Sequence, residues 1–459
     1  MMAALQEFFS SMSSLVWGPP MLILLLGTGI YLTIRLKGVS ISKVPHAITL
    51  IFKKDKDTSE GDVSAFEALA TALSSTIGTG NIAGVATAIA VGGPGAAFWM
   101  WMAALVGMAT KFAEGVLAVK YRVKNKAGEM AGGPMYYIQE GLGEKWKPLS
   151  IFFAACGVMV AWLGIGATVQ ANSMADALNA NFGIKPLYTG IVLSILVGAV
   201  VLGGIKRIAK VASKIVPLMS VIYIGGTLYI ILSHIGELPA AVGLIINSAF
   251  NGQAAVGGFA GAGVMLALRK GISRGIFSNE AGLGSAPIAH AAAKTDSPVR
   301  QGLIAMLGTL IDTIIICSLT TLTIIMTGVW NNGMTGAALT TEAFNVGMPG
   351  PGGLVIAIGI IFFAFSTTLG WCYYGEKCIE YLLGTKAIKP YKFIYILCIL
   401  MGATVKLELI WAISDVVNGL MAFPNLVALL GLSGVVISMT KDYFNNVDIK
   451  ESEELKTIA

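Results

Sequence analysis

Apolar stretches of about 18 to 30 residues recur along this 459-residue chain and decide what it can fold into. Only helices or a closed barrel cross a bilayer, because backbone N–H and C=O groups must be paired within hydrocarbon. Barrel strands are about 10 residues long and alternate apolar with polar residues, which these stretches do not do. Only 12% of the residues are charged, and the polar stretches are too short for a folded soluble domain. The sequence therefore predicts an all-α polytopic membrane protein.

A hydropathy window of about 19 residues predicts eleven spans, one at the N-terminus and then two sets of five. The chain then divides into an N-terminal helix and loop (1–62), a first repeat (63–233), an outer loop (234–254), a second repeat (255–439) and a tail (440–459). An odd number of spans per set predicts an inverted repeat, because the second set enters the membrane from the opposite side. The expected spans are 15–36, 63–92, 96–119, 149–173, 187–204, 211–233, 255–293, 300–327, 351–384, 391–411 and 414–439.

The basic residues predict the orientation in the membrane. Most of the 31 Lys and Arg residues fall in alternate loops and in the C-terminal tail, on one side of the predicted membrane. By the positive-inside rule that side is cytoplasmic, which places the N-terminus outside the cell and the C-terminus in the cytoplasm. The net charge of +6 therefore marks topology and not a nucleic-acid partner. We expect a multi-pass protein of the plasma membrane that lies in the lipid bilayer and has no obligate protein partner.

Polar and glycine-rich residues interrupt two of the predicted spans, at 74–81 and at 271–279. A broken helix at membrane depth presents backbone amides, which favour an anion, and carbonyls, which favour a cation. An amino acid zwitterion uses both. Broken first helices in two inverted halves are typical of secondary transporters. The alternative interpretation is that the glycines only allow close helix packing.

The residues at these breaks are the predicted substrate contacts, and no catalytic residue is expected. Gln170, a neutral amide in the third core span, is a further candidate, although it could equally tie two helices together. Asp312 is a lone acid in an apolar span and a functional candidate by default, with Arg274 as a possible partner. The predicted substrate-binding residues are Thr79, Gly80, Asn81, Gln170, Ser273, Arg274, Gly275, Ile276 and Phe277.

Three segments resemble the alanine or glycine:cation symporters, the sodium:alanine symporter family. They are GGPGAAFWMWMAALVG at 92–107, GGPMYYI at 132–138 and FSNEAGLGSAP at 277–287, with Ala97 where the family pattern usually has a larger aliphatic residue. The resemblance implies a symporter that couples inward Na⁺ flow to uptake of alanine, glycine and similar small neutral amino acids by alternating access. It also implies the fold of the neurotransmitter:sodium symporters. Some members of the family use protons, so a proton-coupled amino acid transporter is the alternative.

A weaker resemblance to the neurotransmitter:sodium symporters concerns the cation. GTGN at 78–81 resembles the GxGN of their first-helix break, and AFSTT at 364–368 resembles the A-x-x-T-S/T of their eighth core helix. Neutral oxygens suit a weakly held hard cation. The alternative is that the hydroxyls of 366–368 bond to carbonyls of their own helix. The resemblance implies one Na⁺ ion held by the carbonyls of Ser74, Ile77 and Ala364 and the hydroxyls of Thr367 and Thr368.

Two other classes of membrane protein compete with a symporter. An intramembrane enzyme needs a nucleophile and base or a metal set at one depth, whereas His46, His234 and His290 fall in separate regions of the chain. A channel needs a filter or a ring of pore-lining charges, which the sequence does not show. We therefore expect neither enzyme activity nor a channel.

Overall fold

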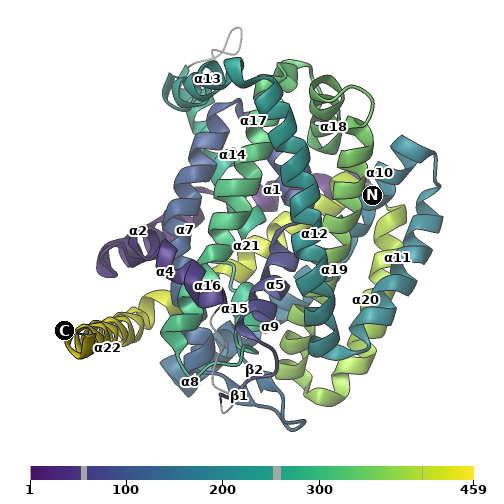
Figure 1. Cartoon of the computed structure of the whole chain (residues 1–459). Helices are drawn as coiled ribbons and strands as arrows, with labels where there is room; N and C mark the ends of the chain where they lie inside the picture. Colours follow the sequence, from purple (N-terminus) through teal and green to yellow (C-terminus); the bar gives the residue numbers. More distant parts are fainter. Residues whose placement is uncertain (1, 53–58, 252–259, 406, 459) are drawn as a thin grey trace.

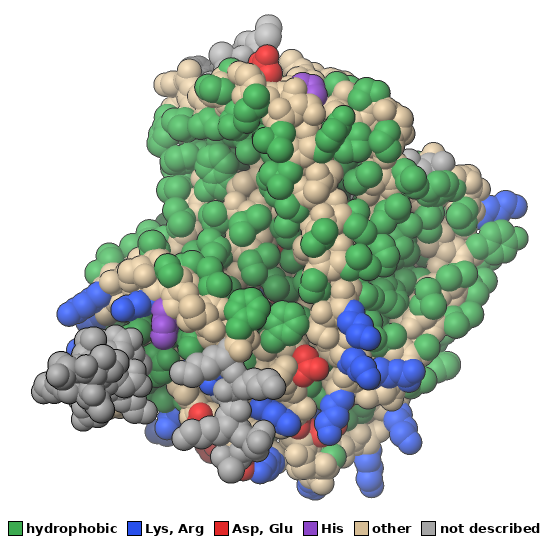
Figure 2. All heavy atoms as spheres, in the orientation of Figure 1, with side chains coloured by type: hydrophobic (Ala, Val, Ile, Leu, Met, Phe, Trp, Pro, Cys, Tyr) green, Lys and Arg blue, Asp and Glu red, His purple; other side chains and the backbone are tan. Residues whose placement is uncertain are grey.

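The computed structural model describes residues 2–52, 59–251, 260–405 and 407–458. In this part of the chain nearly all regular structure is helical, and the strands β1 (Val123–Lys124) and β2 (Met130–Ala131) form one short antiparallel hairpin. Long helices stand side by side in Figure 1. Hydrophobic side chains cover most of the face in Figure 2, and most of its Lys and Arg side chains lie towards the lower end. The predicted all-α polytopic class is confirmed.

The N-terminal segment and the first half of the chain comprise the described residues up to Asn251. The pair α1 and α2 is bent by 42° and together is apolar enough to span. The elements are α1 (Met2–Val16), α2 (Pro19–Arg35), α3 (Val39–Ser42), α4 (Val44–Phe52), α5 (Ala65–Thr76), η1 (Gly80–Gly84), α6 (Val85–Gly92), α7 (Gly95–Lys120), α8 (Pro134–Leu142), η2 (Glu144–Trp146), α9 (Lys147–Leu163), α10 (Thr168–Phe182), α11 (Pro186–Val201), α12 (Gly204–Ser233), η3 (Ile235–Glu237) and α13 (Leu238–Asn251).

The second half ends in a helix that extends away from the other helices in Figure 1. Its elements are α14 (Ala260–Asn279), α15 (Ala286–His290), α16 (Pro298–Thr309), η4 (Leu310–Cys317), α17 (Ser318–Met326), η5 (Val329–Asn331), α18 (Gly336–Gly347), α19 (Gly352–Leu383), η6 (Thr385–Ala387), α20 (Ile388–Thr404), α21 (Leu407–Gly431) and α22 (Ser433–Ile458).

The number of spans is not settled by helix length alone. Among the described residues, seven helices are long and apolar enough to cross a membrane, or eight with the bent pair α1 and α2. Two shorter apolar helices, Gly80–Gly92 and Pro186–Val201, lie where spans are predicted. The predicted eleven spans and the inverted repeat therefore stay predictions.

One predicted span, 149–173, is interrupted. Helix α9 ends at Leu163 and α10 begins at Thr168, with irregular backbone at 164–167. A Cβ atom on Gly166 would lie 2.6 Å from the Ala161 carbonyl oxygen and 2.9 Å from Cβ of Trp371 on α19. The turn is thus packed so closely against its neighbours that only glycine fits there.

The first predicted break is present where the sequence indicates it. Helix α5 begins with a capping box, in which Ser64 Oγ accepts from the Glu67 N–H (3.2 Å) and the Glu67 carboxylate accepts from the Ser64 N–H (2.8 Å). The helix ends at Thr76, and residues 77 and 78 are not helical. The chain then continues as η1, a π-helix, into α6.

The second break begins nine residues later than predicted, at 280 and not at 271, so the prediction of a break at 271–279 is wrong. These residues are helical, because α14 continues to Asn279, and the interruption falls at 280–285. A Cβ atom on Gly271 would collide with the Ala96 carbonyl oxygen of α7, and one on Gly275 would lie 3.4 Å from Met100 Cα. Those two glycines allow close packing of α14 on α7, as the alternative interpretation supposed.

Candidate functional site

At the first break an asparagine side chain replaces a helical hydrogen bond. The Gly78 N–H, which would bond to the Ser74 carbonyl in a continuous helix, donates to Asn81 Oδ1 (2.9 Å). The Ser74 carbonyl therefore lacks its helical donor. Because the carbonyl end of α5 carries partial negative charge, this end of the break favours a cation.

Helix α19 approaches the break with the predicted Na⁺ ligands. Thr367 Oγ1 donates to the Ile77 carbonyl (3.3 Å), and a Cβ atom on Gly78 would lie 2.5 Å from that hydroxyl oxygen. Thr368 Oγ1 instead donates to the Ala364 carbonyl of its own helix (2.5 Å), the alternative that the sequence left open. All five of these residues are buried. Ser74 also faces α19, since a Cβ atom on Gly370 would lie 3.0 Å from Ser74 Oγ.

These residues fit a Na⁺ ion. The predicted ligand atoms are all neutral oxygens, and one of them, the Ser74 carbonyl, has been released from its helix. Hydroxyl groups that now donate to carbonyls can rotate so that their lone pairs face an ion. A loosely held, exchangeable cation requires such a set of neutral ligands.

The side of the break towards η1 gathers four predicted substrate residues. The Thr79 N–H and Oγ1 both point to Gln170 Oε1, at 3.4 and 3.1 Å. Gln170 Nε2 donates to the Ile165 carbonyl (3.0 Å), which fixes the orientation of the amide. A Cβ atom on Gly80 would lie 3.6 Å from Cδ1 of Phe277. Gln170 thus ties α10 to the first break and at the same time lies next to the predicted substrate contacts.

Asp312, on the π-helical segment η4, joins the first break to the second half of the chain. Its Oδ1 atom accepts from Asn81 Nδ2 (2.6 Å) and from Ser278 Oγ (3.2 Å). Its Oδ2 atom accepts from Thr313 Oγ1 (2.7 Å). The side chain is fully buried, and each of these donors is neutral. The carboxylate is therefore hydrogen-bonded but not neutralised by an ion pair in these contacts.

Arg274 pairs with Asp415 of α21, so the expectation that it partners Asp312 is wrong. The guanidinium donates through Nη1 and Nη2 to the two carboxylate oxygens, at 3.1 Å each. Its Cζ atom lies 5.4 and 5.2 Å from the ring centroids of Phe277 and Trp411, which stack on each other. Charge pairing and cation–π contact together hold the guanidinium in one place.

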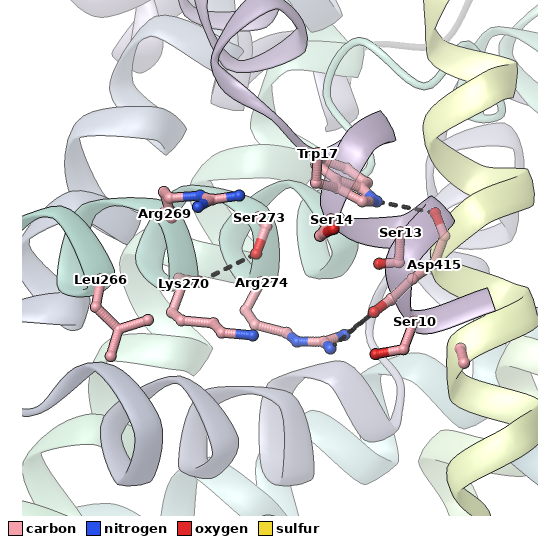
Figure 3. A pocket seen from close by; sticks show the side chains of 11 residues that line it. Ser10, Ser13, Ser14, Trp17, Leu266, Arg269, Lys270, Ser273, Arg274 and Asp415 are labelled. Atoms are coloured by element: carbon pink, nitrogen blue, oxygen red, sulfur yellow. Dashed lines mark hydrogen bonds and ion pairs between the residues drawn. The ribbon is translucent and has the colours of Figure 1, made fainter. Parts of the chain in front are cut away.

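Two cavities meet at this ion pair. One, of about 410 Å³, lies between α1, α14 and α21 and is drawn in Figure 3, where Ser273 and Arg274 point towards the serines of α1. The other, of about 660 Å³, is lined by α6, α10 and α18 and also reaches Arg274 and Trp411. Arg274 thus lines both cavities, and Ala83 of η1 brings the second cavity to the helix that follows the first break.

Two buried carboxylate side chains, those of Glu114 and Glu280, lie at the second break. Glu114 of α7 accepts from the Gly282 and Gly284 N–H groups (3.1 and 3.2 Å) and from Asn425 Nδ2 (2.7 Å). Glu280, which has a φ of +57°, accepts from Ser285 Oγ (2.6 Å) and from Nε1 of the α19 tryptophan (2.8 Å). The Gly282 and Gly284 amides, which the interrupted helix leaves without helical acceptors, are therefore already paired with a carboxylate of the protein, that of Glu114.

The structure brings some of the predicted substrate residues together and not others. Thr79, Gly80, Asn81, Gln170 and Phe277 meet at the first break, as described. Ile276 is buried one residue earlier in the chain, and its carbonyl accepts from the Glu280 N–H (2.8 Å). Ser273 and Arg274 face the cavities, and Gly275 packs on α7.

The sequence analysis did not single out two residues of this region, Asp415 and Trp411. Both lie in the predicted spans near the C-terminus, where a lone Asp in an apolar segment is itself a signal of function. Ser278 was also not included in the predicted site, although it follows Phe277 directly and its Cα would lie 3.4 Å from a Cβ on Gly80.

Comparisons with known proteins agree with the likeness seen in the sequence. The model of the family described as the sodium:alanine symporter family matches residues 2–457. An uncharacterised transporter of Haemophilus influenzae is 54% identical over 456 residues, which is 99% of each chain. The sodium/alanine symporter AgcS of Methanococcus maripaludis is 53% identical and covers 97% of this chain and 98% of its own.

A more distant relative and a solved structure extend the comparison. The probable sodium/glutamine symporter GlnT of Bacillus subtilis is 38% identical, with 96% of this chain and 91% of that protein covered. The crystal structure of MhsT in complex with L-phenylalanine superposes with a TM-score of 0.50 at 15% identity, over 83% of this chain and 99% of that one. At this identity the likeness concerns the fold alone.

Proposed function

Because this chain belongs to the sodium:alanine symporter family, we propose that it couples inward Na⁺ flow to the uptake of small neutral amino acids, alanine and glycine among them. The observation that carries the proposal is the first break. There the Ser74 carbonyl has lost its helical donor, the Thr367 hydroxyl of α19 reaches the Ile77 carbonyl, and the Thr79 backbone amide donates to the neutral Gln170 side chain. The first break would thus bind a cation through carbonyl and hydroxyl oxygens and, next to it, a carboxylate through backbone amides.

The Na⁺ ion would be held by Ser74, Ile77, Ala364, Thr367 and Thr368. In the bound state it supplies positive charge next to the substrate carboxylate. The protein's part is to present neutral oxygens at fixed positions and to exclude water, which strengthens the attraction between ion and carboxylate. Neutral ligands keep the ion exchangeable, which a transport cycle requires.

The proposed substrate is a zwitterion without a charged side chain. Thr79, Gly80 and Asn81 would meet its carboxylate through backbone amides, with Gln170, Ile276 and Phe277 around it and Gly275 one turn away on α14. Phe277 limits the size of the side chain. An acidic side chain would lack a compensating cation, because Arg274 is already paired with Asp415.

Alternating access would then be controlled on both sides of the site. On one side Arg274 pairs with Asp415, with Ser273 lining the adjoining cavity. On the basic end of the molecule the inner halves of the two broken helices touch. We assign the basic end to the cytoplasm, with the N-terminus outside and the two halves, 63–233 and 255–439, as inverted repeats.

Uptake into sealed vesicles tests the proposal. Purified protein is reconstituted in liposomes, and accumulation of radiolabelled alanine is measured with an inward Na⁺ gradient, with an equal K⁺ gradient and with no gradient. We expect saturable accumulation only with Na⁺, competition by glycine and serine, and no competition by glutamate or lysine. Strong competition by lysine would show that an acid such as Asp312 or Glu280 faces the substrate. Absence of accumulation with every gradient would contradict the proposal.

Asp312 favours one second candidate, coupling to protons. A fully buried carboxylate whose contacts are all neutral hydrogen-bond donors is a group that can take up a proton on one side and release it on the other. The test is alanine uptake driven by an inward pH gradient in Na⁺-free buffer. Uptake that persists there and disappears in Asp312→Asn would establish proton coupling, whereas uptake only with Na⁺ would exclude it.

A further inference from the structure

The inner ends of the two broken helices are joined backbone to backbone. Segments 60–63 and 291–295, which we call the inner closure, lie just before α5 and just after α15. The Lys294 N–H donates to the Val63 carbonyl (2.7 Å), and further backbone hydrogen bonds link the same segments. A Cβ atom on Gly61 would collide with the backbone of Lys294, so the two segments are in direct contact. No path from the first break to the basic end can open at this point while they stay together.

Arg122, in the loop between α7 and the β1–β2 hairpin, contacts both segments of the inner closure. Its Nη1 atom donates to the carbonyls of Ala291 and Ala293, at 3.0 and 2.6 Å. Its Nη2 atom donates to the carbonyls of Glu60 and Thr295, at 2.9 and 2.8 Å. One guanidinium group therefore donates to four carbonyl oxygens, one in the segment before α5 and three in the segment after α15.

We propose that Arg122 is a positioning residue for transport, which keeps the inner closure shut until substrate and ion are bound. The inference rests on the proposed symport function, because a closure controls a cycle only where substrate leaves on that side. The acceptors of Arg122 are all backbone carbonyls. Separation of the segments therefore exposes no unpaired buried carboxylate, and both the guanidinium and the carbonyls can be hydrated in the open state. Such a contact is strong when closed and still reversible.

A purely structural role makes a different prediction. Arginine side chains often cap the carbonyl end of a helix, and Ala291 directly follows α15. A cap of this kind stabilises α15 whether or not the protein cycles. It does not require the bond to the Glu60 carbonyl, which belongs to the segment before α5 and links that segment to the one after α15.

The test compares Arg122→Gln and Arg122→Lys with a matched control, Lys124→Gln. Lys124 lies two residues further on, in β1, and contacts the same Glu60, but through an exposed ion pair with the carboxylate (2.5 Å). Amide hydrogen exchange by mass spectrometry is measured on the full-length proteins in lipid nanodiscs, with Na⁺ alone and with Na⁺ plus alanine. The segments to follow are the inner closure and, as a reference for global unfolding, α7 and α16. Alanine uptake by each variant in liposomes is measured in parallel.

We expect the wild-type inner closure to be protected in Na⁺ and to exchange faster when alanine is added. In Arg122→Gln the closure should exchange at least tenfold faster in Na⁺ alone and no longer respond to alanine, with about tenfold slower uptake. The reference helices should keep wild-type exchange. Arg122→Lys should recover part of both effects, because an ammonium offers three donors, and Lys124→Gln should stay within twofold of wild type.

Two results would overturn the proposal while leaving the symport function intact. One is wild-type exchange and uptake in Arg122→Gln. The other is faster exchange throughout α7 and α16, or an alanine response that persists, since either would identify a structural cap. Failure of the wild-type protein itself to accumulate alanine would instead contradict the proposed function.

Discussion

At the first break the neutral Asn81 side chain accepts from the interrupted backbone, whereas at the second break the buried Glu114 carboxylate does so and the Glu280 carboxylate lies beside it. The Gly78 N–H is satisfied by Asn81, and the freed Ser74 carbonyl remains for an ion. At 280–285 Glu114 and Glu280 accept from backbone and side-chain donors within the protein. The same backbone problem is thus solved with exchangeable ligands in one half and with permanent ones in the other. This difference supports the proposal that the first break binds and releases an ion, whereas the contacts at the second break stabilise the fold.

The largest expected effect is the loss of the fixed anion at the second break. Glu114→Ala would leave two backbone N–H groups and the Asn425 amide without their acceptor, at about 1–3 kcal/mol for each buried group. We expect little folded protein and a melting temperature in detergent lowered by more than 10 °C. Glu114→Gln is the control, because its amide oxygen still accepts and should retain most of the stability. Normal melting of Glu114→Ala would show that 280–285 is held by other contacts.

At the first break the expected defect is in transport and not in folding. In Gly78→Ala the new Cβ atom would stand 2.5 Å from Thr367 Oγ1, so the hydroxyl must leave the proposed Na⁺ site. We expect alanine uptake to fall about a hundredfold, which corresponds to about 2.7 kcal/mol, with a melting temperature within a few degrees of wild type. Gly84→Ala is the matched control, because a Cβ atom on Gly84 of η1 has no neighbour within 4 Å. Equal uptake by the two variants would remove Gly78 from the ion site.

The two breaks also differ in how far sequence could predict them. The cluster of Ser, Thr, Gly and Asn at 74–81 is unusual in an apolar span, and the helix does end there because those side chains offer the backbone alternative partners. Gly271 and Gly275 gave a similar signal for a different reason, close packing on α7. Local sequence does not distinguish the two, since the difference lies in which helix is opposite.

The true position of the second break depends on contacts that are distant in sequence. The acceptor Glu114 is on α7 and a further donor, Asn425, is on α21. The local sequence around 280–285 therefore does not reveal the hydrogen bonds that stabilise this segment. One local signal was present in the sequence, namely two glycines, Gly282 and Gly284, just before Pro287. In the structure both glycines have positive φ. The pairing of Arg274 with Asp415 was missed for the same reason, because 141 residues separate them.

A smaller effect is expected from the hydroxyls of α19. Thr367→Ala removes the one hydroxyl that reaches across to the first break, so the Na⁺ concentration for half-maximal uptake should rise about tenfold, or about 1.4 kcal/mol. Thr368→Ala alone should change it less, because that hydroxyl bonds to its own helix. Thr367→Ser serves as the control and should stay near wild type. Unchanged Na⁺ activation in the folded double variant Thr367→Ala, Thr368→Ala would exclude this site.

The smallest effect concerns Trp371, which lies on α19 close to both the second break and the Gly166 turn. Its Nε1 donates to Glu280 Oε1 (2.8 Å), while Glu280 keeps a second donor in Ser285. Trp371→Phe removes one hydrogen bond to a carboxylate and retains the aromatic packing against Tyr374, so we expect about 1–2 kcal/mol lower stability and uptake within threefold of wild type. Thermal melting and alanine uptake of the same preparation measure both. If the affinity for alanine falls tenfold while melting is unchanged, Trp371 contacts the substrate, and the second break takes part in binding as well as in holding the fold.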